Sequence, residues 1–132
     1  MLFLTKFGLM DCFEYILSGA ELPASKPNPA IYQLTAKALG FAPADCVVIE
    51  DATAGIMAAK DAGAYCIAYD NPNSGPQDLS RADKIVSSLS DIVVSDILQN
   101  LILLRFNLWK NLNFTVLQKL FLAKIVNYPL LH

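Results

Sequence analysis

Residues 45–63 of the chain read Asp-Cys-Val-Val-Ile-Glu-Asp-Ala-Thr-Ala-Gly-Ile-Met-Ala-Ala-Lys-Asp-Ala-Gly, and the rest of the chain is organised around them. Its Cys-Val-Val-Ile run is short, apolar and β-branched, which is typical of a strand buried on both faces. Two carboxylates, Glu50 and Asp51, follow the run directly. Thr53 can cap a helix after them, and Gly63 can end that helix. The stretch therefore predicts a strand, an acidic pair and a helix in direct succession.

The acidic pair is the clearest chemical feature of the sequence. In open α/β sheets, ligands bind beyond the carboxyl ends of the strands, and the N-terminus of the following helix attracts anions. Glu50 and Asp51 stand at that position, so they indicate a site for a hard cation or a phosphate. On spacing alone a second interpretation is equally open, in which the two carboxylates only stabilise the positive end of the helix dipole.

Strand and helix patterns alternate along the first 95 residues. The expected elements are the end of a helix in 1–10, a short strand at 15–18, an amphipathic helix at 31–39 that Gly40 ends, strands at 64–69 and 84–86, and a loop at 70–76. Such alternation implies right-handed crossovers between parallel strands. The predicted fold class is therefore α/β with a parallel sheet.

Charge is distributed unevenly along the chain. Residues 1–96 carry twelve acidic and six basic side chains, whereas residues 97–132 carry four basic side chains and no acidic one. The overall net charge of −2 gives no reason to expect nucleic-acid binding. We therefore divide the chain into a domain at 1–95 and an apolar, basic tail at 96–132.

The tail is rich in leucine and is predicted to be helical. Its longest uncharged runs are eight residues, far below the roughly 20 apolar residues that a membrane-spanning helix needs. A basic amphipathic helix on a membrane surface is not favoured, because the apolar residues occupy most of the helix circumference rather than one face. The composition favours an extension that a protein partner buries, or a segment foreign to the domain.

The three cysteines, Cys12, Cys46 and Cys66, are widely spaced and form no Cys-x-x-Cys motif. This spacing predicts neither a zinc site nor a disulfide framework. Cys46 and Cys66 fall in predicted strands, where a free cysteine acts as a small buried hydrophobic residue in a reducing compartment. The apolar N-terminus contains Lys6 and no small-residue cleavage site, so we expect no signal peptide and a cytoplasmic location.

Two motifs occur in order along the chain: Ser-Lys-Pro-Asn-Pro at 25–29 and Val-Ile-Glu-Asp-Ala-Thr-Ala-Gly-Ile at 48–56. With them the chain resembles the haloacid dehalogenase-like (HAD) hydrolases, and among these the branch of β-phosphoglucomutase and the sugar-phosphate phosphatases. The resemblance runs from about residue 2 to residue 92. It implies a partial Rossmann-like sheet flanked by helices, to which the Leu-rich tail is an atypical addition.

The resemblance also implies roles for the matching residues. Lys26 matches the lysine that bridges the nucleophilic carboxylate and the substrate phosphate, where its charge neutralises phosphoryl oxygens. Glu50 and Asp51 match the acidic pair that holds Mg²⁺, directly or through water. The implied substrate is a small phosphate monoester such as a sugar phosphate. Without the resemblance, Lys26 also fits a solvated loop lysine.

The nucleophile of the family lies in an Asp-x-Asp motif, and none occurs in these 132 residues. The resemblance places that motif, a second phosphate-binding motif and the helical cap ahead of residue 1. We therefore expect a truncated C-terminal half, inactive alone, whose sheet lacks the strand that the family places beside the acidic pair. The alternative is a non-catalytic fragment that binds or complements another chain, or associates with itself, through the open sheet and the apolar tail.

Overall fold

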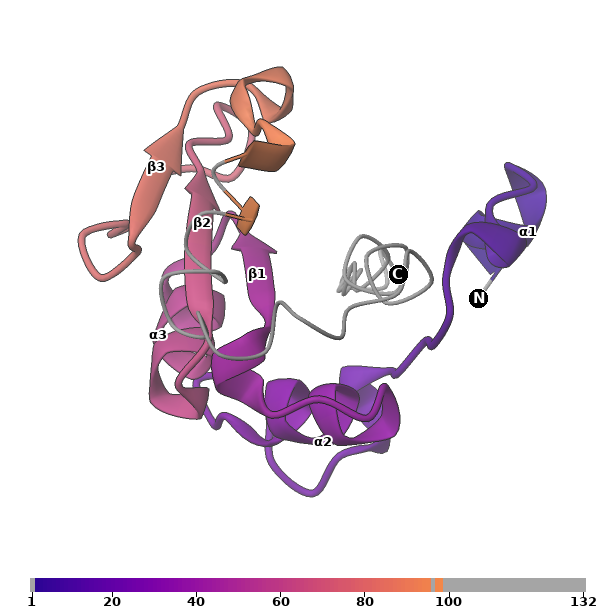
Figure 1. Cartoon of the computed structure of the whole chain (residues 1–132). Helices are drawn as coiled ribbons and strands as arrows, with labels where there is room; N and C mark the ends of the chain where they lie inside the picture. Colours follow the sequence, from indigo (N-terminus) through magenta and orange to yellow (C-terminus); the bar gives the residue numbers. More distant parts are fainter. Residues whose placement is uncertain (1, 96, 99–132) are drawn as a thin grey trace.

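The computed structural model describes residues 2–95, 97 and 98 of the chain. In this part, three strands form one parallel sheet in the order β1, β2, β3 (Figure 1). The strands are β1 (Val47–Glu50), β2 (Tyr65–Tyr69) and β3 (Lys84–Val86), and the labelled helices are α1 (Leu2–Lys6), α2 (Ala30–Ala38) and α3 (Thr53–Ala62). The predicted α/β class with a parallel sheet is confirmed.

Helix α3 is the crossover between β1 and β2. The register of these two strands aligns Val48 with Cys66 and Glu50 with Ala68. Because side chains alternate along a strand, these four residues point to the same face of the sheet. Helix α3 packs against both strands, and α2 packs against α3. The carboxyl ends of β1 and β2 therefore lie side by side at one end of the strands, beside the first turn of α3.

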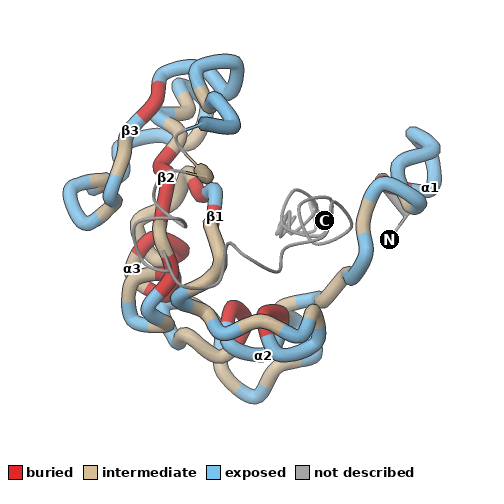
Figure 2. Tube along the Cα trace, viewed as in Figure 1, coloured by how far each residue is buried: buried red, intermediate tan, exposed pale blue. Residues whose placement is uncertain are grey.

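The hydrophobic core lies between this face of the sheet and the two helices (Figure 2). Ile56 is completely buried, and the small side chain of Ala59 allows α3 to lie close to the strands. Helix α2 adds Ile31 to the same core. Cys66 is buried there as a free cysteine, as the sequence predicted. The same prediction is wrong for Cys46, which precedes β1 and is only partly buried.

The two ends of α3 show one confirmed and one wrong prediction. Gly63 ends the helix with a φ of +88°, a left-handed conformation that glycine adopts without strain. Thr53 does not cap the helix, because it is the first helical residue and Ala52 occupies the N-cap position without a side-chain cap. The backbone amide of Thr53 instead donates a hydrogen bond of 2.9 Å to Gln77 Oε1. A side chain from a distant loop therefore replaces the local cap.

Two strand predictions are also wrong. Residues 15–18 pair with no strand among the described residues, and Figure 1 shows the chain between α1 and α2 without a strand. An extended segment without a hydrogen-bonded neighbour is not a strand. Strand β1 begins after Cys46 and is not buried on both faces, since Ile49 is 38% exposed. Ile49 points away from α3, and β1 is an edge strand of the described sheet.

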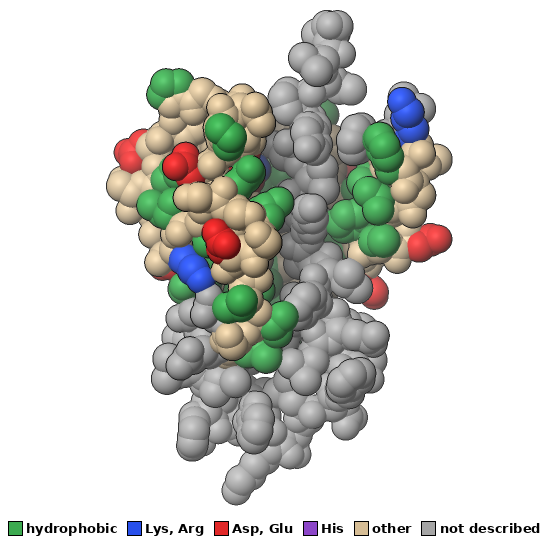
Figure 3. All heavy atoms as spheres, turned by 90° about the horizontal axis from the view of Figure 1, so that it is seen from above, with side chains coloured by type: hydrophobic (Ala, Val, Ile, Leu, Met, Phe, Trp, Pro, Cys, Tyr) green, Lys and Arg blue, Asp and Glu red, His purple; other side chains and the backbone are tan. Residues whose placement is uncertain are grey.

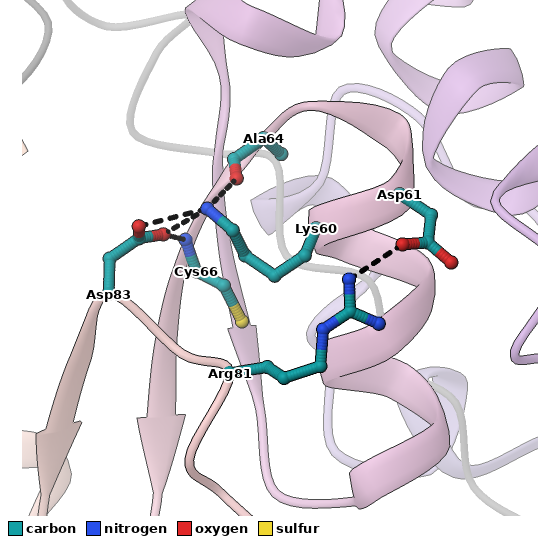
Figure 4. A network of polar contacts seen from close by, with 6 residues as sticks. All are labelled: Lys60, Asp61, Ala64, Cys66, Arg81 and Asp83. Carbon is teal, nitrogen blue, oxygen red and sulfur yellow. Dashed lines mark hydrogen bonds and ion pairs between the residues drawn. The ribbon is translucent and has the colours of Figure 1, made fainter.

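The segment that leads into β3 is bound to α3 and β2 by a polar network (Figure 4). Asp83 Oδ2 accepts hydrogen bonds from the backbone amide of Cys66 at 2.7 Å and from Lys60 Nζ at 2.6 Å. Lys60 also donates to the carbonyl oxygen of Ala64 at 3.1 Å. These contacts fix the point at which β3 begins to pair with β2.

The predicted tail at 96–132 lies outside the described residues, apart from 97 and 98. The boundary at residue 95 and the helical character of the tail therefore stay predictions. Among the residues that the structure does describe, no helix combines the length and the apolar character needed to cross a membrane.

Candidate functional site

The candidate site lies at the carboxyl end of β1. Glu50 is the last residue of this strand, and Asp51 follows it just before α3 begins. Lys26 reaches the same place from the loop that precedes α2, and its ammonium forms an ion pair with Glu50. The fold thus brings together the three residues that the sequence analysis selected, although Lys26 and Glu50 are 24 positions apart.

Glu50 is a buried carboxylate, with 8% of its side chain exposed. Its Oε1 accepts hydrogen bonds from Lys26 Nζ and from the hydroxyl group of Tyr32 on α2. Lys26 is itself only 12% exposed, and its ammonium lies 5.1 Å from the centre of the Tyr32 ring. Lys26 is therefore a largely enclosed, paired lysine, and the interpretation as a solvated loop residue is wrong.

Tyr32 and Gly55 complete the enclosure of Glu50. Burial and the adjacent charge of Glu50 raise the pKa of Tyr32 above its ordinary value of 10.0, so its hydroxyl keeps the proton that it donates. Gly55 lies in the first turn of α3, and a Cβ at this position would overlap the Glu50 carboxylate. The missing side chain of Gly55 is thus what allows α3 to start against a buried glutamate.

Asp51 faces the loop that follows β2. Its Oδ2 accepts hydrogen bonds from Asn71 Nδ2 at 2.8 Å and from Ser74 Oγ at 2.7 Å. The hydrogen bonds from Asn71, from Ser74 and from the backbone amide of Asp51 itself, together with the charge of Lys26, lower the pKa of Asp51 below its ordinary value of 3.8, although partial burial acts in the opposite direction. Asp51 is therefore an ionised, partly accessible carboxylate at neutral pH.

The two carboxylates differ in what they offer to a cation. Glu50 Oε1 is already shared by a lysine and a tyrosine. Both side-chain donors to Asp51 bind Oδ2, so Oδ1 has no side-chain donor among the described residues. In the same part of the chain, no group of three or more His, Cys, Asp or Glu side chains could enclose a metal ion. Mg²⁺ is commonly held by one or two carboxylates while waters and phosphate oxygens complete its shell. These residues therefore fit a water-rich Mg²⁺ site on Asp51, with Glu50 beside it.

Tyr32, Asn71 and Ser74 are part of the site, and the sequence analysis did not single them out. Residues 70–76 were predicted only as a loop. Asn71 and Ser74 were within reach of prediction, because polar residues after the next parallel strand meet Asp51 at the same sheet edge. Tyr32 gave a weaker signal, namely that a tyrosine buried on a helix needs a partner for its hydroxyl group.

The fold and the position of the acidic pair place the domain among α/β proteins whose ligand sites lie at the carboxyl ends of parallel strands. Residues 1–69 match the sequence profile described as haloacid dehalogenase-like hydrolase. The chain belongs to this family, as its two motifs indicated.

Individual relatives confirm the branch of phosphatases and phosphomutases. Hexitol phosphatase A of Escherichia coli (strain K12) is 38% identical over 62% of this chain and 38% of its own length. The crystal structure of β-phosphoglucomutase from Clostridium difficile has a TM-score of 0.66 at 28% identity, over 79% of this chain and 45% of the other. A HAD family hydrolase from Deinococcus radiodurans R1 with bound phosphate and sodium has a TM-score of 0.61 at 30% identity, over 74% and 45%. The chain spans less than half the length of the curated relatives it matches.

Proposed function

We propose that residues 1–95 form the phosphate- and Mg²⁺-binding part of a phosphatase or phosphomutase that acts on small phosphate monoesters such as sugar phosphates. The observation that carries the proposal is the pair of the partly buried Lys26 and the buried Glu50, directly beside the ionised carboxylate of Asp51. Two relatives support the substrate class, since one is a hexitol phosphatase and another a β-phosphoglucomutase. The relative from Deinococcus radiodurans R1, whose crystal structure has bound phosphate and sodium, supports binding of an anion and a cation by proteins of this fold.

Each residue has a distinct task in this proposal. Lys26 presents its desolvated ammonium to the phosphoryl oxygens, whose negative charge it offsets. Glu50 holds that ammonium by its ion pair, and Tyr32 supports the pair by donating to the same oxygen of Glu50 and by placing its ring 5.1 Å from the ammonium. Asp51 holds Mg²⁺, which when bound neutralises further charge on the phosphate. The nucleophile is not supplied, because these 132 residues contain no Asp-x-Asp motif. We therefore expect no hydrolysis of p-nitrophenyl phosphate by this chain alone.

Titration of the chain with MgCl₂ and with inorganic phosphate, followed by NMR, tests the proposal. We expect both to shift the amide signals of residues 50–56. Asp51→Ala should lose the Mg²⁺ response. The double variant Lys26→Met/Glu50→Gln, which leaves no buried charge unpaired, should lose the phosphate response. Lys37→Met at an exposed site on α2 is the matched control and should retain both.

Two results would contradict the proposal. The first is a wild-type chain that binds neither ion, and the second is an Asp51→Ala variant that binds Mg²⁺ as the wild type does. The prediction of inactivity has its own test, since Mg²⁺-dependent turnover that Asp51→Ala abolishes would show that the chain is a complete catalyst.

A second candidate function is that of a non-catalytic half that binds or complements another chain. Strand β1 has one neighbour among the described strands, and Ile49 beside that open edge is 38% exposed. Figure 3 shows further hydrophobic side chains on the surface of the described part, and Leu89, Val93 and Val94 are among the exposed ones. Co-purification with an N-terminal half, lost when 97–132 is deleted, would support this candidate. A chain that stays monomeric at all concentrations would contradict it. The protein partner, self-association and the cytoplasmic location stay predictions.

A further inference from the structure

The loop at 70–78, which follows β2, holds one oxygen of Asp51 from two sides. Asn71 Nδ2 and Ser74 Oγ both donate to Asp51 Oδ2, at 2.8 and 2.7 Å. The amide group of Asn71 is itself oriented, because its Oδ1 accepts a hydrogen bond of 3.0 Å from the backbone amide of Asn73. The two donors belong to one turn, in which the backbone amide of Ser74 donates to the carbonyl oxygen of Asn71 at 3.1 Å. The orientation of the Asp51 carboxylate is therefore set by two side chains of the same turn.

Gln77 connects this loop to the start of α3. Its Oε1 accepts hydrogen bonds from the backbone amide and the hydroxyl group of Thr53, at 2.9 and 3.0 Å. Its Nε2 donates to the carbonyl oxygen of Ser74 at 3.1 Å. The backbone amide of Asp78 closes the circuit by donating to Thr53 Oγ1 at 2.8 Å. The position of Ser74 relative to Asp51 thus depends on a side chain three residues further along the loop.

We propose that Asn71, Ser74 and Gln77 are positioning residues for the cation site: they hold Asp51 by Oδ2 and leave Oδ1, which has no side-chain donor among the described residues, to bind Mg²⁺. This inference deepens the proposed function and rests on it. Removal of a hydrogen bond to a metal ligand typically weakens metal binding by about 10–100-fold.

A different role of the same contacts would be purely structural. The N-cap residue Ala52 has no side-chain cap, and Gln77 satisfies the first amide of α3 in its place. If capping were the only role of the loop, its variants would lose stability while the folded fraction bound Mg²⁺ with unchanged affinity. Stability and Mg²⁺ affinity must therefore be measured separately.

The experiment is an NMR titration of the full chain with MgCl₂, read at the amides of residues 50–56, with urea unfolding of each variant. Asn71→Ala and Ser74→Ala are expected to weaken Mg²⁺ binding about 10-fold, and Gln77→Ala to weaken it less. Asn73→Ala keeps its backbone amide and is the matched control, with the affinity of the wild type. Ser74→Thr keeps the hydroxyl group and should restore the affinity. If Ser74→Ala does not fold, Ser74→Cys, which keeps a side chain of similar size with only a weak donor, is used instead.

The outcomes separate the two proposals. If the wild type binds Mg²⁺ and every loop variant binds it equally well, the inference about the loop is overturned and the proposed function stands. If the wild type binds no Mg²⁺, or Asp51→Ala binds it as the wild type does, both are overturned. Weaker binding by Asn71→Ala and Ser74→Ala, with unchanged binding by Asn73→Ala and Ser74→Thr, supports the loop as the element that orients Asp51.

Discussion

Replacement of Gly55 by alanine tests how the buried part of the site is built. A Cβ at residue 55 would overlap the Glu50 carboxylate, well inside normal contact distance. The Glu50 side chain cannot easily move aside, because its Oε1 is held by Lys26 from the loop before α2 and by Tyr32 from α2. The added methyl group can therefore be accommodated only if Glu50 leaves its partners or α3 moves away from β1.

Two opposing effects set the size of the change. Alanine is favoured over glycine inside a helix by about 1 kcal/mol. Separation of a buried ion pair such as Lys26–Glu50, whose side chains are 12% and 8% exposed, costs about 3–5 kcal/mol when one charge loses its partner. The second effect is larger, so we expect Gly55→Ala to lower the free energy of unfolding by about 2–4 kcal/mol.

Urea unfolding followed by circular dichroism measures this change, as a shift of about 1–2 M in the midpoint. The same substitution in a Lys26→Met/Glu50→Ala background is the decisive control. Without the Glu50 side chain, Gly55→Ala should be neutral or should stabilise by about 1 kcal/mol. If Gly55→Ala alone leaves the urea midpoint unchanged, the Glu50 carboxylate does not limit the space at residue 55. An undiminished loss in the double-variant background would show that the methyl group meets something other than Glu50.

The remaining contacts give three expected outcomes. Asp83→Ala removes the acceptor of the Cys66 backbone amide and should lower the free energy of unfolding by about 1–3 kcal/mol in urea titrations. Asp51→Asn should be destabilising at neutral pH and should match the wild type in acid. The reason is that the folded state lowers the pKa of Asp51. The ionised carboxylate therefore stabilises the fold fully above the pKa of the unfolded state, and this stabilisation is lost as the pH falls through the pKa of the folded state. Urea titrations of both proteins from about pH 7 to about pH 2 measure the difference. Cys12 alone should react with iodoacetamide in the folded protein, as seen by mass spectrometry, because burial raises the pKa of Cys46 to about 11 and that of Cys66 to about 12.

Each outcome can be contradicted. Asp61→Ala is the control for Asp83→Ala, because Asp61 pairs with Arg81 where both side chains are about half exposed, at 46% and 48%. Such a pair contributes less than about 1 kcal/mol, so equal losses in the two variants would argue against a special role of Asp83. A stability difference at Asp51 that does not change with pH would argue against an ionised, hydrogen-bonded carboxylate. Modification of Cys66 as fast as Cys12 would show that the core is open.

Local patterns in the sequence were sufficient for most of the fold from residue 30 to residue 86. Helix α2, strand β2 and strand β3 lie within one residue of their predicted positions. These elements are specified by hydrophobic periodicity and by glycines such as Gly63, both of which are properties of neighbouring residues. The adjacency of Glu50 and Asp51 at a strand end also needed no long-range information.

The wrong predictions share a physical cause, which is dependence on distant residues. Residues 15–18 have an apolar, strand-like pattern, but a strand exists only beside another strand. Thr53 has the chemistry of a cap, yet Gln77, 24 positions away, supplies the acceptor. Ile49 belongs to an apolar run, but its exposure depends on what packs against the far face of the sheet. For each of these residues, the partner that determines its structure lies outside the short stretch of sequence around it.

Glu50 and Asp51 are neighbours in the sequence, yet their partners come from different parts of the fold. Those of Glu50 are Lys26 and Tyr32, whereas those of Asp51 lie in the loop after β2. For Glu50 to turn towards a cation, it would have to leave a buried ammonium without a counter-ion, which costs several kcal/mol. A bound phosphate removes that obstacle, because its oxygens can replace Glu50 as the counter-ion of Lys26. We therefore expect positive coupling, in which bound phosphate raises the affinity for Mg²⁺ and bound Mg²⁺ raises the affinity for phosphate. Lys26 connects the two sites, because it pairs with Glu50 when phosphate is absent and with phosphate when it is bound.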